Sequence, residues 1–205
     1  MIPAPDARLR FDPARLGLRP APRAFFRRET VEVARSLIGS WFARRRRGRW
    51  YGGRIVETEA YIGQADAAAH SWKGRRTARV EPMYRDGGTL YVFFVYGMHY
   101  CANVVTRGPG DPQAVLLRAA EPPDGAPLRL LAGPARLCAA LGVTKAASGL
   151  DLVEGEEYRI FLARGTRPRI AVSPRIGVDY AGEAAAWLLR FFDEESAAVS
   201  VRPRR

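Results

Sequence analysis

The stretch from Arg54 to Gly63, RIVETEAYIG, sets acidic side chains inside an apolar segment with high strand propensity. In a regular strand, alternation would give one face the side chains of Ile55, Glu57, Glu59 and Tyr61. The other face would carry Val56, Thr58, Ala60 and Ile62. A buried carboxylate is costly unless it is hydrogen-bonded or used in chemistry, because desolvation disfavours its charged form. The segment is therefore either an edge strand with its acids in water or part of a functional site.

The composition indicates one globular domain without a membrane span. The chain has 205 residues, of which 47% are hydrophobic, so it is long enough for one substantial domain and short for two. Its apolar runs are far shorter than the roughly 18 residues of a membrane helix. The N-terminus has prolines, arginines and acids where a signal peptide would have a continuous apolar segment. We therefore expect a cytoplasmic protein that does not associate with membranes.

The charge favours a polyanionic partner. The chain has 33 basic and 21 acidic residues and a formal net charge of +12, as nucleic-acid-binding proteins often do. Arginine richness also follows from biased genome composition, so charge alone does not identify the partner. Cys101 and Cys138 lie in apolar surroundings without C-x-x-C spacing, which predicts buried free thiols and neither a zinc site nor a disulfide framework.

The order of the patterns gives a domain plan. Residues 1–23 are rich in Pro and Arg and predict an extended or disordered arm before a single domain at residues 24–205. Helices are predicted over residues 31–38, 67–71, 133–141 and 183–189. Strands are predicted over residues 41–43, 54–62, 89–95, 99–106, 114–120, 158–163, 170–172 and 198–201. Residues 44–49 read as a basic turn, either a solvated tip or a phosphate clamp, and residues 72–86 as a basic loop facing a substrate.

A predicted hairpin carries large side chains at its tip. Residues 89–95 and 99–106 are its strands, and Tyr96, Met98 and His99 lie between or beside them. Large apolar side chains are unusual at a tip that only faces solvent. Either the tip folds back onto the core, or it inserts between base steps of a duplex as apolar wedges do.

Arg118 and His70 are two further residues that could act together with the acidic stretch. Arg118 is charged within an otherwise apolar predicted strand, and such an arginine usually pairs with a carboxylate; Glu57 and Glu59 are candidates. Asp66 is placed to cap the short helix at residues 67–71, which would hold His70 near the acidic strand.

The chain resembles the alkyladenine (3-methylpurine) family of DNA glycosylases. The matching blocks are RIVETEAYIG at 54–63, AAAHS at 67–71, GTLYVFFVYGMHYCANVV at 88–105, AVLLRAAEP at 114–122, GPARLCAALGV at 133–143 and RIGVDYAGE at 175–183. They span most of the chain beyond residue 23, and their combination is not a general fold signature. The resemblance implies an α+β fold: a single compact domain with a curved, mostly antiparallel sheet flanked by helices and a protruding β-hairpin.

The resemblance also implies an activity and residue roles. The protein would flip an alkylated or deaminated purine out of double-stranded DNA and hydrolyse its N-glycosidic bond, acting as a monomer with no cofactor and no metal. Glu59 would be the general base that activates water, with Arg118 and the Val178 carbonyl helping to hold that water. The base pocket would be lined by Tyr61 and His70, with Phe93 on the opposing wall and Asn103 as a gate against guanine. Tyr96 would fill the gap left in the duplex, supported by Met98 and His99.

The residues alone leave part of this open. A regular strand puts Glu57 and Glu59 on one face, so only the resemblance makes Glu59 the base and leaves Glu57 a structural role. Phe93 stands where some relatives have tyrosine, so stacking is kept and a hydroxyl is lost. The C-terminal block also lacks an expected Lys-Pro before residues 189–192. The matching blocks contain no lysine that could act as an amine nucleophile, so Schiff-base chemistry and strand cleavage are not expected.

Two other functions fit some of the same residues. A metal-dependent nuclease or phosphoesterase could use Glu57, Glu59, Asp66 and His70 as ligands, although it would leave the aromatic residues unexplained. A non-catalytic nucleic-acid-binding module could rely on the basic arm and the hairpin. Activity that persists in chelator would exclude the first. Tight, salt-sensitive binding without base release would indicate the second.

Overall fold

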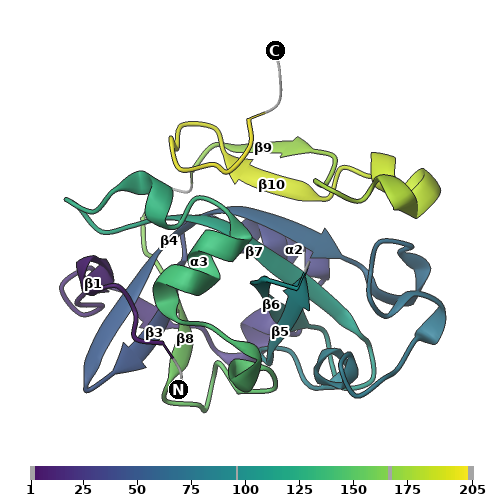
Figure 1. The fold of residues 1–205 in the computed structure, drawn as a ribbon, viewed down its shortest axis with the longest axis horizontal. Helices are drawn as coiled ribbons and strands as arrows, with labels where there is room; N and C mark the ends of the chain where they lie inside the picture. Colours follow the sequence, from purple (N-terminus) through teal and green to yellow (C-terminus); the bar gives the residue numbers. More distant parts are fainter. Residues whose placement is uncertain (1–2, 96, 166–167, 203–205) are drawn as a thin grey trace.

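A ten-stranded, curled sheet organises the protein (Figure 1). The computed structural model describes residues 3–95, 97–165 and 168–202. Its strands are β1 Arg10–Phe11, β2 Arg19–Pro20, β3 Trp41–Arg46, β4 Arg49–Tyr61, β5 Leu90–Val95, β6 His99–Thr106, β7 Gln113–Glu121, β8 Tyr158–Leu162, β9 Ile170–Ser173 and β10 Arg190–Asp193. All paired strands are antiparallel, and the main order is β2-β8-β3-β4-β7-β6-β5. In addition, β1 and β10 both pair with β4, and β9 pairs with β10. The predicted α+β fold with a curved antiparallel sheet in a single domain is confirmed.

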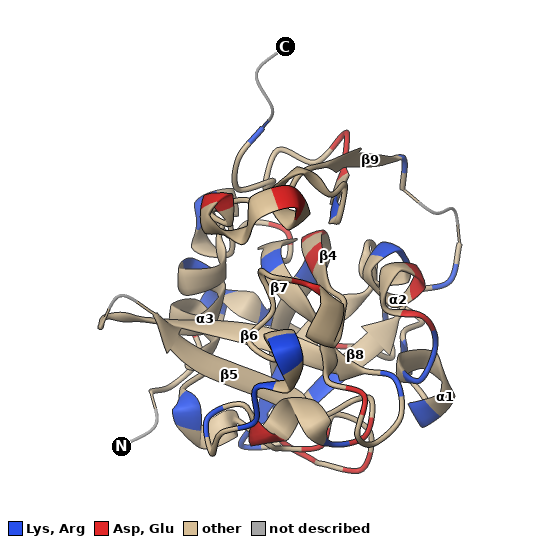
Figure 2. Cartoon of the chain, turned by 90° about the vertical axis from the view of Figure 1, so that its right-hand side faces the viewer, with Lys and Arg blue, Asp and Glu red and all other residues tan. Residues whose placement is uncertain are grey.

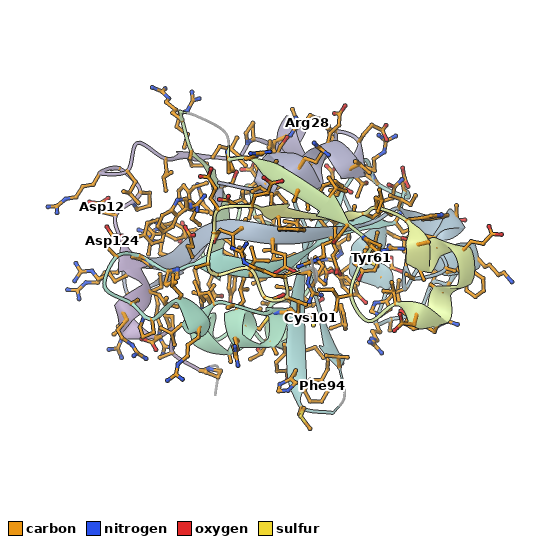
Figure 3. The ribbon with its side chains drawn as sticks, turned by 90° about the horizontal axis from the view of Figure 1, so that it is seen from above. Asp12, Arg28, Tyr61, Phe94, Cys101 and Asp124 are labelled. Carbon is orange, nitrogen blue, oxygen red and sulfur yellow. The ribbon has the colours of Figure 1, made fainter. Side chains whose placement is uncertain are left out.

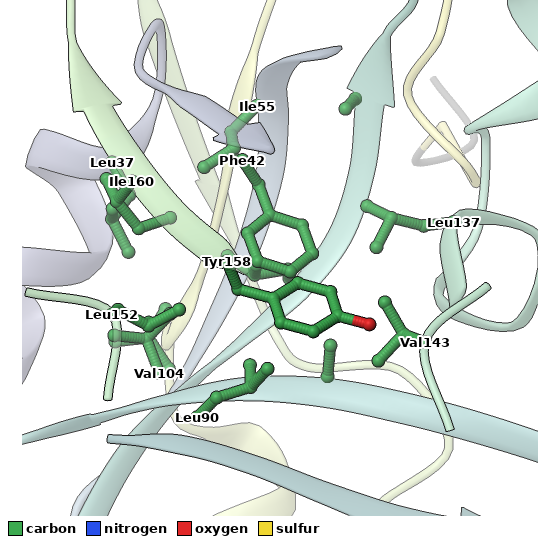
Figure 4. Packing of buried hydrophobic residues seen from close by; sticks show 14 of the residues in the cluster. Leu37, Phe42, Ile55, Leu90, Val104, Leu137, Val143, Leu152, Tyr158 and Ile160 are labelled. Atoms are coloured by element: carbon green, nitrogen blue, oxygen red, sulfur yellow. The ribbon is translucent and has the colours of Figure 1, made fainter. Parts of the chain in front are cut away.

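Helices close the curl of the sheet around the main core. The α-helices are α1 Arg23–Phe26, α2 Thr30–Leu37 and α3 Pro134–Leu141. The 3₁₀ helices are η1 Ala7–Leu9, η2 Gly63–Ala65, η3 Trp72–Gly74, η4 Glu81–Tyr84, η5 Leu128–Leu130, η6 Lys145–Ala147 and η7 Asp179–Ala186. Leu37 of α2 and Leu137 of α3 pack into one buried cluster, at whose centre the rings of Phe42 and Tyr158 stack 6.1 Å apart (Figure 4). Among the residues that the structure describes, no helix is long and apolar enough to cross a bilayer.

Strand β4 is the longest strand and pairs along both edges. Its first half pairs with β3 and β1, and its second half with β7 and β10. The register against β7 shifts on either side of Glu57, and such a bulge changes which face the following residues occupy. Ile55 therefore packs in the main core together with Ala60, on the side away from Glu59. The prediction that Ile55 shares a face with the acids is wrong for this reason.

The basic turn predicted at residues 44–49 is shorter than expected. Strand β3 continues through Arg46, and Arg44 is buried. Its Nη1 donates to the carbonyls of Pro3 (2.8 Å), Leu141 (3.0 Å) and Gly142 (2.9 Å). Arg44 is therefore neither a solvated tip nor a phosphate clamp. It ties the N-terminal residues to the end of α3.

Residues 3–20, for which composition suggested an extended or disordered arm, lie against the sheet. Strand β1 pairs with β4 and β2 with β8, while Leu9 is fully buried and the ring of Phe11 lies 4.5 Å from that of Trp41. A few well-placed apolar side chains, spaced too irregularly to give a periodic signal, hold this Pro- and Arg-rich segment in place.

Three predicted elements take other forms. Residues 67–71 form turns in place of a helix, and the helix expected at 183–189 is instead the end of the 3₁₀ helix η7. Residues 198–201 form no strand; they are a turn and bend beside β10. The other predicted strands and the helices at 31–38 and 133–141 are confirmed to within a few residues.

Candidate active site

The acids of β4 lie in the interior, and neither is an exposed edge residue. The side chains of Glu57 and Glu59 have no solvent-exposed surface. Figure 2 shows these acidic positions on β4 within a fold whose basic positions are spread widely. Arg118 of β7 reaches both: its Nε lies 2.9 Å from Glu57 Oε1 and its Nη1 lies 3.3 Å from Glu59 Oε1. The predicted pairing of Arg118 with these carboxylates is confirmed.

Glu59 is held by neighbours on both carboxylate oxygens. The Tyr61 hydroxyl donates to Oε2 at 2.9 Å, and the backbone N–H of Ile176 donates to Oε1 at 2.8 Å. A carboxylate offers about four acceptor positions, so these bonds orient Glu59 and leave lone pairs free. Burial and the adjacent Glu59 charge raise the pKa of Tyr61 well above its ordinary value, so this phenol stays protonated and acts as the donor.

A cavity of about 400 Å³ lies above this group. Its lining includes Tyr61, His70, Phe93, His99, Asn103, Arg118 and Val178, all of which the sequence had singled out. The lining also includes Tyr91, Cys101, Leu116, Ile176 and Tyr180. Glu59 itself lies behind the lining and touches it through its hydrogen bonds with Tyr61 and Ile176. The cavity is large enough for a flat heterocycle and has the mixed aromatic and polar walls that such ligands require.

His70 and Phe93 belong to one aromatic wall. Their ring centroids are 4.5 Å apart at an interplanar angle of 84°, and the Phe93 ring lies 5.8 Å from that of Tyr91. The resemblance had placed His70 and Phe93 on opposing walls, whereas in the structure their rings are in edge-to-face contact. Tyr61 lies in a different cluster, together with Ala68 and Val178. Aromatic groups in such positions offer both an edge and a face to a bound ring.

The polarity of this wall is set by burial. Burial, reinforced by the charges of Arg79 and Arg75, lowers the pKa of His70 to about 4, so the imidazole is neutral at pH 7. Its Nδ1 lies 2.8 Å from the Tyr91 hydroxyl. Asn103 Nδ2 donates to the carbonyls of Tyr91 at 3.1 Å and Cys101 at 3.4 Å, which fixes the side-chain amide at the cavity wall.

The loop leading to the cavity is fixed by a buried ion pair. Arg175 contacts Asp66 at 2.5 Å and 2.8 Å, and neither side chain is exposed. Asp66 also accepts from the backbone N–H groups of Ile62 and Ala68, so it caps the turn that presents His70. The predicted capping role of Asp66 holds, but the capped element is a turn. Val178 lies in this region and is buried; its carbonyl accepts from the Ala181 N–H at 2.9 Å.

The hairpin of β5 and β6 stands out from the body of the protein (Figure 3). Phe94 lies near its end, whereas Tyr61 and Cys101 lie toward the centre of that view. Met98 is 67% exposed and His99 is also exposed, so the described part of the tip does not fold back onto the core. Tyr96, predicted to be the intercalating residue, lies outside the described residues.

Sequence reasoning missed some residues of the site. Tyr91 was recoverable, because it alternates with Phe93 along a strand. Arg175 and Arg190 were not, because their carboxylate partners Asp66 and Glu57 are more than 100 residues away in the chain. The contribution of Ile176 comes from its backbone, which no residue type signals. The cysteine prediction is correct: Cys101 and Cys138 are free and buried.

The acids do not form a metal-binding group. Within the described ranges, no three His, Cys, Asp or Glu side chains are grouped so that they could hold an ion. Glu57 is bonded to Arg118 and Arg190, and Asp66 to Arg175. Arginine therefore occupies oxygens of two of the four ligands, Glu57 and Asp66, that the nuclease alternative would use.

Comparison with known proteins identifies the family. A sequence model described as methylpurine-DNA glycosylase matches residues 24–197. A protein of Desulfitobacterium hafniense is 43% identical over 201 residues, covering 88% of this chain and 98% of the relative. One of Myxococcus xanthus is 46% identical over 186 residues, covering 89% and 94%. Both carry the name "Putative 3-methyladenine DNA glycosylase". The chain belongs to the methylpurine-DNA glycosylase family.

Proposed function

We propose that this protein flips a damaged purine out of duplex DNA and hydrolyses its N-glycosidic bond with a water activated by Glu59. The observation that carries the proposal is the position of Glu59: a fully buried carboxylate directly behind an aromatic cavity of about 400 Å³. The names of the relatives specify 3-methyladenine, which we take as the substrate class here.

The reaction follows from the groups at the site. Glu59 accepts a proton from water as the water oxygen bonds to the anomeric carbon, and the bond from that carbon to the base nitrogen breaks. The base leaves with the bonding electrons, and an abasic deoxyribose remains. Positive charge develops on the sugar as in glycoside hydrolysis, so the same carboxylate also stabilises the transition state.

The cavity walls support selection of damaged purines. N-alkylated purines are cationic and interact favourably with aromatic faces such as those of Tyr61 and Phe93. They leave without protonation, whereas a neutral deaminated base needs a hydrogen-bond donor, and neutral His70 can supply one. Damaged pairs also cost less to open than normal ones.

The positions of the lysines support hydrolysis without strand cleavage. A lyase reaction needs an amine nucleophile, and the chain has only two lysines, Lys73 and Lys145. Neither lines the cavity beside Glu59. We infer a monofunctional enzyme.

The test is base release from duplex oligonucleotides that carry 3-methyladenine or hypoxanthine, with chelator present. We expect the wild-type protein to release the base and leave an intact backbone, and Glu59→Gln to lose the activity by a factor of about 1,000 or more. Activity of Glu59→Gln near that of the wild type would refute the assignment. Activity that requires a divalent ion would favour the nuclease alternative, and tight binding without release would favour the binding module.

A further inference from the structure

The second buried acid, Glu57, is held by hydrogen bonds to both of its carboxylate oxygens. Its Oε1 accepts from Arg118 Nε at 2.9 Å and Arg190 Nε at 2.8 Å, and its Oε2 accepts from the Ser200 N–H at 2.7 Å. Burial opposes its charge, but Arg118 and Arg190 outweigh burial and hold the pKa of Glu57 below its ordinary value. Glu57 is therefore a permanent anion in a defined position.

Arg118 lies between two carboxylates and is hydrogen-bonded to only one of them. Its Nε bonds Glu57 at 2.9 Å, while Nη1 stays 3.3 Å from Glu59. A guanidinium is planar, so the bond at Nε sets the direction in which Nη1 and Nη2 point. Nη2 meets the Ser200 hydroxyl at 3.4 Å. The two-point contact of one arginine with one carboxylate, which is the strong form of this ion pair, is not formed with Glu59.

We propose that Glu57 is a positioning residue that competes for Arg118 and so keeps Glu59 free to accept a proton from water. This inference rests on the proposed function, in which Glu59 is the base. Without the Glu57 charge, Arg118 turns toward Glu59 and forms a two-point pair with it. That pair occupies the lone pairs that the attacking water needs.

The end of the chain takes part in this arrangement. Besides Arg118, Glu57 has two partners, Arg190 of β10 and Ser200, and both belong to the C-terminal layer formed by β9, β10 and residues 194–202. Within that layer, Arg190 also donates to the Ser173 hydroxyl at 3.0 Å and to the Val201 carbonyl. Figure 1 shows β9 and β10 lying together along one side of β4. This layer therefore supplies Arg190 and Ser200, which fix Glu57 and through it the direction of Arg118.

The first experiment compares Glu57→Gln with a matched control. Glu121→Gln removes another β4–β7 carboxylate, one that accepts from Arg54 Nε at 2.9 Å and does not touch Arg118. Base release is measured in single turnover at saturating enzyme, and affinity is measured on the same lesion duplex. We expect Glu57→Gln to lower the release rate by about 100-fold at unchanged affinity, as misplacement of a site group does, and Glu121→Gln to keep the wild-type rate. Equal rates in the two variants would overturn the proposal.

A double-mutant cycle with Arg118→Gln separates positioning from a general structural role. If Glu57 acts through Arg118, adding Glu57→Gln to Arg118→Gln costs no further rate, whereas independent effects multiply. Multiplied losses would overturn the proposal. If Glu57→Gln does not fold, Glu57→Asp decides, because it keeps the negative charge but shortens the side chain and so withdraws the carboxylate from Arg118 Nε: a lowered rate at unchanged affinity supports positioning, and a wild-type rate refutes it.

The outcomes also separate this inference from the proposed function. An active Glu59→Gln enzyme removes the base assignment on which both depend. An inactive Glu59→Gln enzyme together with a fully active Glu57→Gln enzyme leaves the proposed function in place and rejects positioning by Glu57.

Discussion

The Nδ1 atom of His70 lies 2.8 Å from the hydroxyl of Tyr91, inside the cavity wall. Burial raises the pKa of Tyr91 to about 12, so its hydroxyl keeps its proton. When that hydroxyl donates to Nδ1, a neutral imidazole carries its own proton on Nε2. His70 then presents a fixed hydrogen-bond donor, which a departing neutral base can use.

Tyr91→Phe is expected to affect neutral lesions more than cationic ones. The variant keeps the ring and loses the group that fixes the imidazole tautomer. Release of hypoxanthine should fall by about tenfold, equivalent to about 1.4 kcal/mol, while release of 3-methyladenine should change little. Parallel single-turnover rates on the two duplexes measure this difference. Equal losses for both lesions would contradict a role of the hydroxyl in the departure of the neutral base, and no loss for either would show that Tyr91 serves only packing.

The pKa of His70 makes a defined contribution to the pH dependence of stability. An unfolded histidine binds a proton near pH 6.5, whereas His70 in the folded protein does so only near pH 4. Between these values the unfolded state holds more protons, so this contribution to stability is complete above pH 6.5 and is lost as the pH falls toward 4. The loss amounts to at most about 3 kcal/mol.

Chemical denaturation at pH 7 and pH 4.5 tests this contribution. The difference between wild type and His70→Gln should shrink or reverse at the lower pH, because the variant lacks the group that titrates. His99, the other histidine of the chain, is exposed and provides the matched control. His99→Gln should follow the wild-type dependence on pH. An identical dependence in all three proteins would contradict the burial of a neutral His70.

The sequence could predict the parts of the site that local patterns encode. The strand with its acids, the hairpin and Arg118 were all visible, because period-two alternation and a charge in an apolar strand are local signals. The side of the sheet on which Ile55 lies could not be predicted, since the bulge beside Glu57 depends on the pairing of β4 with β7. Sequence pattern assumes a regular strand, and tertiary pairing decided otherwise.

The unequal surroundings of the two acids also required the structure. Alternation puts Glu57 and Glu59 on one face and makes them equivalent. Their difference arises from distant partners: Arg190 and Ser200 reach Glu57, whereas Tyr61 and Ile176 reach Glu59. Contacts between segments so far apart in the chain leave no periodic trace, so a single sequence could not have assigned them.

Asp66→Asn should destabilise the protein strongly. The Asp66–Arg175 pair is completely buried, and removing one partner leaves an uncompensated charge, which costs about 3–5 kcal/mol. Glu81→Gln is the control, because Glu81 pairs with Arg76, both side chains are about half exposed, and such a surface pair contributes about 1 kcal/mol or less. The free energy of unfolding in urea compares the two variants. Similar small losses in both would mean that the Arg175 site rearranges or admits water.

Asn103 is expected to set discrimination against undamaged guanine. Its amide lines the cavity and is held by donation to the Tyr91 and Cys101 carbonyls, so it cannot swing aside to admit the exocyclic amine of guanine. Asn103→Ser shortens the side chain and removes that obstruction. Release of guanine from undamaged duplex DNA should rise by about tenfold or more, with little change on 3-methyladenine.

Thr106→Ser provides the control for the Asn103 variant. Thr106 is a buried polar residue of the same strand, and its hydroxyl lies 2.7 Å from that of Thr30. It does not line the cavity, so its shortening should leave guanine release at the wild-type level. Guanine release that rises equally in both variants would point to loosening of β6 as a whole. Release that rises in neither would place the selectivity elsewhere, in the ease with which a damaged pair opens.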